Sequence, residues 1–137
     1  SGWQLSDGTL GSERFRGLAR LPRLVFSNAC NSAEDAPQKK ERMGHAPNTG
    51  MASGLVLAGV GAVVGARWPI LAESSAALAN IFFHRLFLGY PLGAALREAR
   101  LVTRRARGDD DLFWAAFILY GNPVQRLAPI APAAACK

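Results

Sequence analysis

Cysteine and histidine are the residues of this chain that could carry nucleophilic chemistry, and Cys30 is the best placed of them. It follows Leu24–Asn28, an apolar run typical of a buried strand. At the carboxyl edge of a sheet in an α/β protein, a side chain leaves the core and faces the crevice where ligands bind. A free cysteine is also among the most buried residue types. The strand therefore allows two interpretations of Cys30, as a structural thiol or as a nucleophile.

A nucleophilic thiol needs a base or a positive environment that lowers its pKa, and it needs donors for the oxyanion. The chain has two histidines, His45 and His84. His45 falls in a long polar segment, which is a poor support for a general base. His84 falls within a predicted helix beside its apolar positions, and we interpret it as a half-exposed helical residue. The residues alone thus do not supply a partner for Cys30.

The glycine-rich segment GVGAVVG, Gly59–Gly65, does not predict a dinucleotide site. Its spacing is G-x-G-x-x-x-G and it leads into a strand, whereas the dinucleotide fingerprint follows a strand and opens a helix. Close packing of a helix on a sheet explains these glycines. Histidine, cysteine and carboxylate residues do not recur at metal-ligand spacing, so the sequence predicts no metal or other cofactor.

The elements that must position these residues follow from periodicity and turn chemistry. We expect a hairpin that turns at Asp7-Gly8, a short helix that Ser12 caps, and a long surface loop over residues 31–49. The other predicted elements are helices over Met51–Val60, Ser74–Leu88 and Pro91–Arg107, and strands over Leu24–Asn28, Ala62–Arg67 and Leu112–Tyr120. The first two of these strands should be parallel neighbours, joined by a right-handed crossover.

Composition and charge limit the classes of partner. The chain has 137 residues, is 50% hydrophobic and 19% charged, and is typical of one globular domain. The net charge of +6 is dispersed except at Arg104–Gly108, where arginines complement a helix dipole and the glycine ends the helix. We therefore expect no nucleic-acid partner. The uncharged stretch Met51–Ala66 is shorter than the ~20 residues that a bilayer needs, so we expect no membrane partner either.

The number of cysteines indicates the redox compartment, and the first residues indicate whether the chain is part of a longer protein. Two cysteines, Cys30 and Cys136, are too few for a disulfide scaffold, so a reducing, cytoplasmic compartment is expected. The chain starts at Ser1 in a stretch that already has the pattern of folded structure, and we interpret it as part of a longer protein.

Four blocks of the sequence together resemble the CHAT domain, a caspase-like cysteine protease module often fused to TPR repeats. They are LPRLVFSNACNSA, GLVLAGVGAVVGARWPI, LFLGYPLGAALREAR and FWAAFILYGNP, in that order. The resemblance runs from about Trp3 to Pro123. The family pattern at the nucleophile is a buried strand followed by Ser-Ala-Cys and often Glu-Thr. Here Asn28 is inserted before Ala29, and Asn31 and Ser32 stand in place of Glu-Thr.

This resemblance implies a fold and a site. The fold would be α/β, part of a caspase-like three-layer α/β/α sandwich with a mostly parallel sheet, over residues 1–123, with a Pro/Ala-rich tail over 124–137. Cys30 would be the nucleophile. Its base would be a histidine in a His-Gly pair that precedes the segment at Ser1, so we expect the 137-residue chain alone to be inactive. Asn31 and Trp68 would contribute to substrate binding, although a core tryptophan is an equal alternative for Trp68.

The expected function is therefore that of a cysteine endopeptidase that hydrolyses protein substrates, with TPR repeats or other regulatory domains as partners in the same chain. The departures at Asn31 and Ser32 leave open an alternative, a degenerate CHAT domain that serves as a signalling or scaffold module. A binding module of an unrelated α/β class is a third possibility. Thiol reactivity separates the first from the others, because a structural cysteine is inert.

Overall fold

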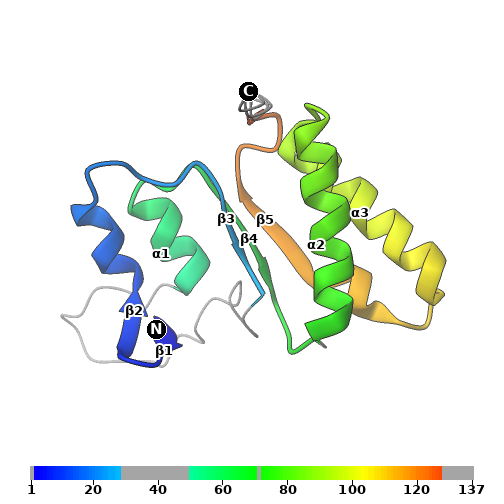
Figure 1. Ribbon diagram of the computed structural model, residues 1–137, viewed down its shortest axis with the longest axis horizontal. Coiled ribbons are helices and arrows are strands. Elements are labelled where there is room, and N and C mark those ends of the chain that lie inside the picture. Colours follow the sequence, from blue (N-terminus) through cyan, green and yellow to red (C-terminus); the bar gives the residue numbers. More distant parts are fainter. Residues whose placement is uncertain (1, 29–49, 71, 128–137) are drawn as a thin grey trace, which may run out of the picture. The chain divides into compact units, whose positions relative to one another are not determined.

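The computed structural model describes residues 2–28, 50–70 and 72–127 and shows a mixed α/β chain (Figure 1). These residues form two compact units. The first unit comprises Ser1–Ile70 with Ala116–Gly121, and the second comprises Leu71–Ala115 with Asn122–Lys137. The predicted α/β class is confirmed.

The first unit contains a three-stranded sheet in the order β3-β4-β5. Strand β3 (Val25–Ser27) runs parallel to β4 (Ala62–Ala66), and β5 (Phe117–Gly121) runs antiparallel to β4 on its other side. The predicted parallel pair is thus confirmed. All five residues of β4 are buried, as expected for a central strand that reads as a continuous run of small and β-branched residues.

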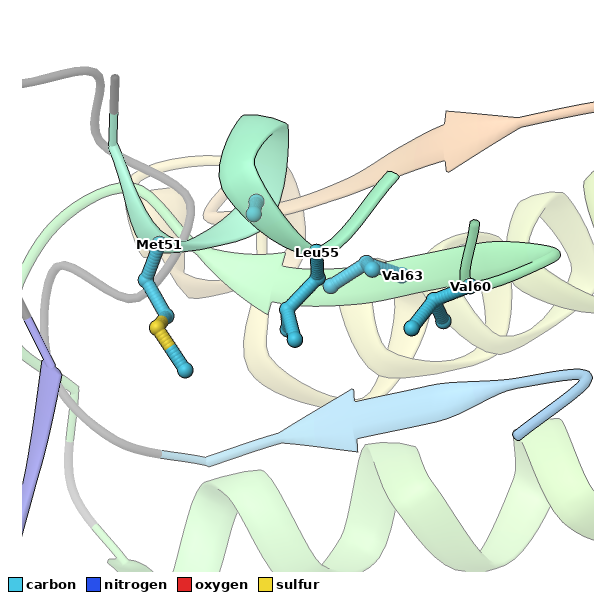
Figure 2. Packing of buried hydrophobic residues seen from close by; sticks show 5 residues of the cluster. Met51, Leu55, Val60 and Val63 are labelled. Carbon is cyan, nitrogen blue, oxygen red and sulfur yellow. The ribbon is translucent and has the colours of Figure 1, made fainter. Parts of the chain in front are cut away.

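The core of the first unit lies between α1 (Met51–Leu57) and the sheet. Its buried side chains are Met51, Ala52, Leu55, Val60 and Val63, of which Figure 2 labels four. Trp3, Phe15, Val25, Val56 and Tyr120 pack around this cluster and are partly buried. Helix α1 ends three residues before the predicted Val60, because Gly59 takes a φ of 101°, a backbone conformation that ends a helix.

The N-terminal hairpin is formed by β1 (Gly2–Leu5) and β2 (Gly8–Gly11). Leu5 pairs with Gly8, so the two loop residues are Ser6 and Asp7, one residue earlier than the predicted Asp7-Gly8 turn. The reason is that Gly8 itself, with a φ of 144°, is the first paired residue of β2. Its lack of a Cβ allows this conformation.

The short helix after the hairpin is a 3-10 helix, η1 (Ser12–Gly17). Its N-cap residue is Gly11 and no side chain caps it, so the prediction that Ser12 is the cap was wrong. Phe15 does point inward and meets the Trp3 ring edge-on at 6.3 Å. Leu18, three residues after Phe15, is 49% exposed because the helix ends at Gly17 and Leu18 is extended.

The second unit is built on two helices that pack against each other, α2 (Ala72–Phe87) and α3 (Leu92–Arg107). Helix α2 begins two residues before Ser74, the predicted start of this helix, so Ser74 and Ser75, either of which could have capped it, lie in its first turn and are buried. The predicted stops are confirmed. Gly89 and Gly108 follow the two helices with φ values of 83° and 88°.

The buried face of α3 agrees closely with its predicted apolar spacing. The apolar spacing of the sequence predicts an inward face of Leu92, Ala95, Leu96, Ala99 and Val102. The first four are buried, and Thr103 is buried in place of Val102. The Thr103 hydroxyl donates a hydrogen bond to the Ala99 carbonyl at 2.8 Å. This intrahelical bond satisfies the hydroxyl and makes its burial tolerable.

The start of α3 is capped by backbone rather than by a side chain. The amide of Leu92 donates to the Gln125 carbonyl at 2.9 Å, and the amide of Gly93 donates to the Pro123 carbonyl at 2.8 Å. Arg126 reaches back to the Gly89 carbonyl. The hydrogen bonds from Leu92 and Gly93 satisfy two first-turn amides, which a helix leaves without intrahelical partners.

Only the second half of the predicted strand Leu112–Tyr120 is a strand in the structure. Leu112–Ala115 form a second 3-10 helix, η2, and the strand begins at Phe117. The Asp111 carboxylate accepts a hydrogen bond from the Phe113 amide at 2.9 Å, which favours a helical turn here. None of the helices in the described ranges is both long and apolar enough to cross a membrane.

Candidate functional site

The carboxyl edge of the β3 and β4 pair is the part of the first unit that could support chemistry. Ser27, the last residue of β3, pairs with Gly65 of β4. Because the strands are parallel, both chains leave the sheet at the same edge. Ser27 is buried at 6% exposure, whereas the next residue, Asn28, is exposed. The chain therefore emerges from the core just before the sequence reaches Cys30.

Trp68 lies three residues beyond Gly65, after β4 has left the same edge. Its side chain is 38% exposed, so Trp68 is not a core tryptophan. The segment is anchored by Arg67, whose amide donates to the Ala116 carbonyl at 3.0 Å and so extends the hydrogen bonding between β4 and β5 by one residue. An exposed aromatic ring on an anchored segment is available for a ligand.

Three of the residues considered from the sequence lie outside the described residues. These are Cys30, the expected nucleophile, Asn31, the expected substrate contact, and His45. His84 is described and is exposed on α2, as expected for a helical surface residue. Within the described ranges, no group of three histidine, cysteine or carboxylate residues could hold a metal ion.

Close backbone approaches fix the opposite, amino-terminal end of these two parallel strands. A Cβ on Gly61 would lie 2.8 Å from the Arg23 carbonyl oxygen, and the Gly61 amide donates to the Pro22 carbonyl at 3.3 Å. On the other side of β4, Gly121 has a φ of 121°, and a Cβ there would lie 2.7 Å from the Gly61 carbonyl oxygen. Gly61 and Gly121 therefore serve the close approach of backbones beside β4, which differs from the helix-to-sheet packing that the sequence predicted for the glycine-rich segment.

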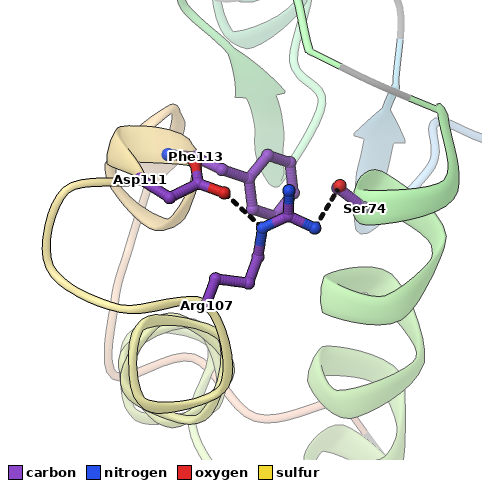
Figure 3. A network of polar contacts seen from close by, with 4 residues as sticks. All are labelled: Ser74, Arg107, Asp111 and Phe113. Atoms are coloured by element: carbon purple, nitrogen blue, oxygen red, sulfur yellow. Dashed lines mark hydrogen bonds and ion pairs between the residues drawn. The ribbon is translucent and has the colours of Figure 1, made fainter.

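The second unit contains a polar network that the sequence did not predict (Figure 3). The guanidinium of Arg107, at the end of α3, donates to Ser74 Oγ at 2.7 Å and to the carboxylate of Asp111. It also lies 5.5 Å from the centroid of the Phe113 ring. The hydrogen bonds from Arg107 and from the Phe113 amide hold the pKa of Asp111 below its usual value. This network ties the end of α3 to the start of α2.

A sequence model of the CHAT domain matches residues 1–122 of the chain. The chain belongs to the CHAT domain family. The match covers both compact units up to Asn122 and agrees with the four blocks noted in the sequence. No curated protein and no solved structure matches this CHAT domain.

CHAT domains are caspase-like modules, so family membership directs attention to the carboxyl edge of β3 and β4 as the candidate site. The parallel pair could be anticipated from the sequence, whereas the sequence left open whether Trp68 is exposed or a core tryptophan. Arg107 and Ser74 could not be anticipated, because they are 33 residues apart and neither lies in a recognisable motif. The available signal was the opposite charge of the RRAR and DDD runs, residues 104–107 and 109–111.

Proposed function

We propose that this CHAT domain is a caspase-like cysteine endopeptidase with Cys30 as its nucleophile. The observation that carries the proposal is the register of the parallel pair. Ser27 is opposite Gly65, and in sequence Cys30 and Trp68 each come three residues after one of these partners. Ligand sites of α/β sheets occupy the crevice at such an edge. The exposure of Trp68 supports a role in binding the substrate beside the nucleophile.

The proposed reaction has two steps. The Cys30 thiolate attacks a peptide carbonyl, and the tetrahedral oxyanion is held by backbone amides, of which that of Cys30 is one. A histidine of the family's His-Gly pair protonates the leaving amine, and an acyl-enzyme thioester remains. Water, deprotonated by the same histidine, then attacks the thioester, so that the carboxylate product and the thiolate are released. In this proposal Asn31 and Trp68 contribute to substrate binding.

The wider architecture is part of the same proposal. The crossover from β3 through α1 to β4 and the packed helices α2 and α3 are components that a three-layer α/β/α sandwich with a mostly parallel sheet would use. The substrate would be a protein, and TPR repeats or other regulatory domains in the same chain would be the partners.

A catalytically degenerate CHAT domain that acts as a signalling or scaffold module is the alternative. One observation favours it. Asn31 and Ser32 replace the Glu-Thr pair that often follows the nucleophile in the family. The two functions differ in the state of one thiol, because a nucleophile is activated whereas a structural cysteine is inert.

The test uses the intact protein that carries this domain, at pH 7. We expect cleavage of a peptide library, loss of cleavage in Cys30→Ala, and full cleavage in the matched variant Cys136→Ala. Iodoacetamide should alkylate Cys30 at least about tenfold faster than a free thiol with a pKa near 8.5. Cleavage that survives Cys30→Ala would refute the proposal. Alkylation of Cys30 no faster than that of Cys136, without cleavage, would establish the scaffold function instead.

A further inference from the structure

Four arginines form a line along one flank of α3. They are Arg97, Arg100, Arg104 and Arg107, at successive spacings of three, four and three residues. At 3.6 residues per turn, these positions fall within about 80° of the helix circumference. Together they are called the arginine flank below. The arginine flank lies beside the buried face of α3, the face that includes Ala99.

The two arginines at the C-terminal end of this flank already have carboxylate partners. Arg104 Nε donates to Asp109 at 2.6 Å and its guanidinium lies 5.1 Å from the Trp114 ring centroid. The hydrogen bond and the charge of Asp109 raise the pKa of Arg104. Arg107 binds Asp111 in the network of Figure 3. The charges of Arg104 and Arg107 are therefore balanced by those of Asp109 and Asp111.

The two arginines nearer the start of the helix are not neutralised in this way. Arg97 is 75% exposed and makes a loose contact of 3.8 Å with its neighbour Glu98, a surface pair of small energetic value. Arg100 is half-buried and has no carboxylate partner among the described residues. Its Nε is buried without a hydrogen-bond partner, and burial lowers the pKa of Arg100.

A half-buried cation without a counter-charge is costly, because desolvation disfavours the charged form and no ion pair offsets it. Trp114 supplies a second donor without an acceptor, since its Nε1 is also buried and has no partner. Its ring lies beneath Arg104, on the same flank. The flank therefore has an uncompensated positive charge at Arg100 and, beside Arg104, a buried donor without an acceptor.

We propose that Arg97 and Arg100 form a docking site for an acidic segment of a partner protein. The two positions lie one helical turn apart, so two carboxylates of a short peptide, or one carboxylate held bidentately, can meet both guanidinium groups. The partner is recognised by its aspartate and glutamate side chains. The site belongs to the second unit and does not depend on whether Cys30 is a nucleophile.

A nucleic acid fits this flank less well. Proteins that bind DNA through its backbone typically neutralise about 6–10 phosphates, whereas two arginines are available here. At the other end of the flank, the carboxylates of Asp109 and Asp111 neutralise Arg104 and Arg107, so that end offers no net positive charge to a continuing phosphate backbone. An acidic segment that ends within two helical turns avoids them.

The test measures binding of a fluorescein-labelled decamer of alternating glutamate and glycine to the intact protein by fluorescence anisotropy in 0.05 M salt. Arg97→Gln and Arg100→Gln should each weaken binding about 3–10-fold, which corresponds to roughly 0.7–1.4 kcal/mol. The matched control is Arg105→Gln, which removes the same charge from the same helix about 80° away from the flank and should change binding less than about twofold.

Three results would overturn the proposal. The first is that the glutamate–glycine decamer binds no more tightly than the same decamer with glutamine in place of glutamate. The second is an equal loss in Arg105→Gln and Arg100→Gln, which would indicate attraction by net charge alone. The third is tighter binding of a ten-nucleotide single strand than of the peptide, with the same dependence on Arg97 and Arg100, which would assign the flank to nucleic acid.

A measurement on the free protein separates a docking residue from a structural one. Arg100→Met keeps the aliphatic packing and removes the unpaired charge, so it should leave the melting temperature unchanged or raise it while weakening peptide binding. A fall in melting temperature of more than about 5 °C, which for this size is on the order of 1 kcal/mol, would show that Arg100 stabilises the fold and would refute its role as an unpartnered docking cation.

Discussion

Replacing Gly61 with alanine tests how closely two backbones must approach at the start of the parallel strands, the end opposite the candidate site. Gly61 lies just before β4, and a Cβ there would come 2.8 Å from the Arg23 carbonyl oxygen. Ordinary van der Waals contact requires at least 3.4 Å. The atom in the way is backbone, so it cannot swing aside as a flexible side chain would. The chain entering β3 must instead move away from the start of β4 by roughly half an ångström.

Two opposing effects set the size of the loss. Alanine reduces the freedom of the unfolded chain and by itself stabilises a protein by about 0.4–1 kcal/mol where the backbone conformation suits it. Overpacking costs about 1–3 kcal/mol, and loss of the hydrogen bond from the Gly61 amide to the Pro22 carbonyl costs about 1 kcal/mol more. We therefore expect Gly61→Ala to lower the free energy of unfolding by about 1–3 kcal/mol.

Circular dichroism during thermal unfolding provides the assay. The loss corresponds to a fall in melting temperature of about 4–12 °C for a domain of this size. Gly17→Ala is the control, because open space surrounds the Cβ position at Gly17 and its melting temperature should stay within about 2 °C of the parent. A Gly61→Ala protein as stable as the parent would show that the two backbones can separate without cost and would refute the reasoning.

Further variants probe the core, a helix start and a charged pair. Leu55→Ala removes a fully buried side chain and should cost about 2–5 kcal/mol in urea unfolding, whereas a cost below about 1 kcal/mol would contradict its core position. Gly93→Ala should lower the melting temperature although alanine favours helices, because its Cβ would lie 2.8 Å from Pro123 Cβ. The pKa of Asp111 is held down by Arg107, so its contribution to stability is present above its ordinary value of 3.8 and is lost as the pH falls through the lowered pKa. Asp111→Asn should therefore flatten the decline of melting temperature below about pH 4, and an unchanged slope would count against the pair.

Long periodic segments of the sequence were sufficient to predict the elements that build the fold. The buried face of α3 and the parallel neighbours β3 and β4 follow from apolar spacing and from the order strand, helix, strand. Glycine stops at Gly89 and Gly108 were also predictable, since a positive φ after a helix favours glycine.

Helix starts were predicted less well, for a physical reason. Serine is a good N-cap, yet Ser12 and Ser74 both lie inside the first turn of their helices. In α3 the first amides are satisfied by carbonyls of the C-terminal segment, 30 and 33 residues away in sequence. Local sequence carries no information on such distant partners, so capping rules that look one residue ahead do not find them.

The candidate site was predictable in its position and not in its chemistry. The end of β3 follows from the strand pattern, whereas the exposure of Trp68 came from the structure, because the sequence allowed a core tryptophan equally well. The role of Cys30 came from family resemblance, because a strand end by itself does not distinguish a nucleophile from a buried thiol. Arg97 and Arg100 were hidden because they are spaced along a helix, whereas the RRAR run stood out in sequence, and two of its arginines, Arg104 and Arg107, proved to be paired with aspartates.

The central position of β4 in its sheet has a consequence for how the chain is made. Its partner β3 precedes it, but β5 begins at Phe117, 51 residues after β4 ends at Ala66. At about 5–20 residues per second, a ribosome takes roughly 3–10 s to synthesise that interval. Throughout it, the nascent chain exposes one edge of its most apolar strand. Recovery of folded protein from cells should therefore depend on translation speed and on chaperones that shield this edge until Phe117–Gly121 has emerged.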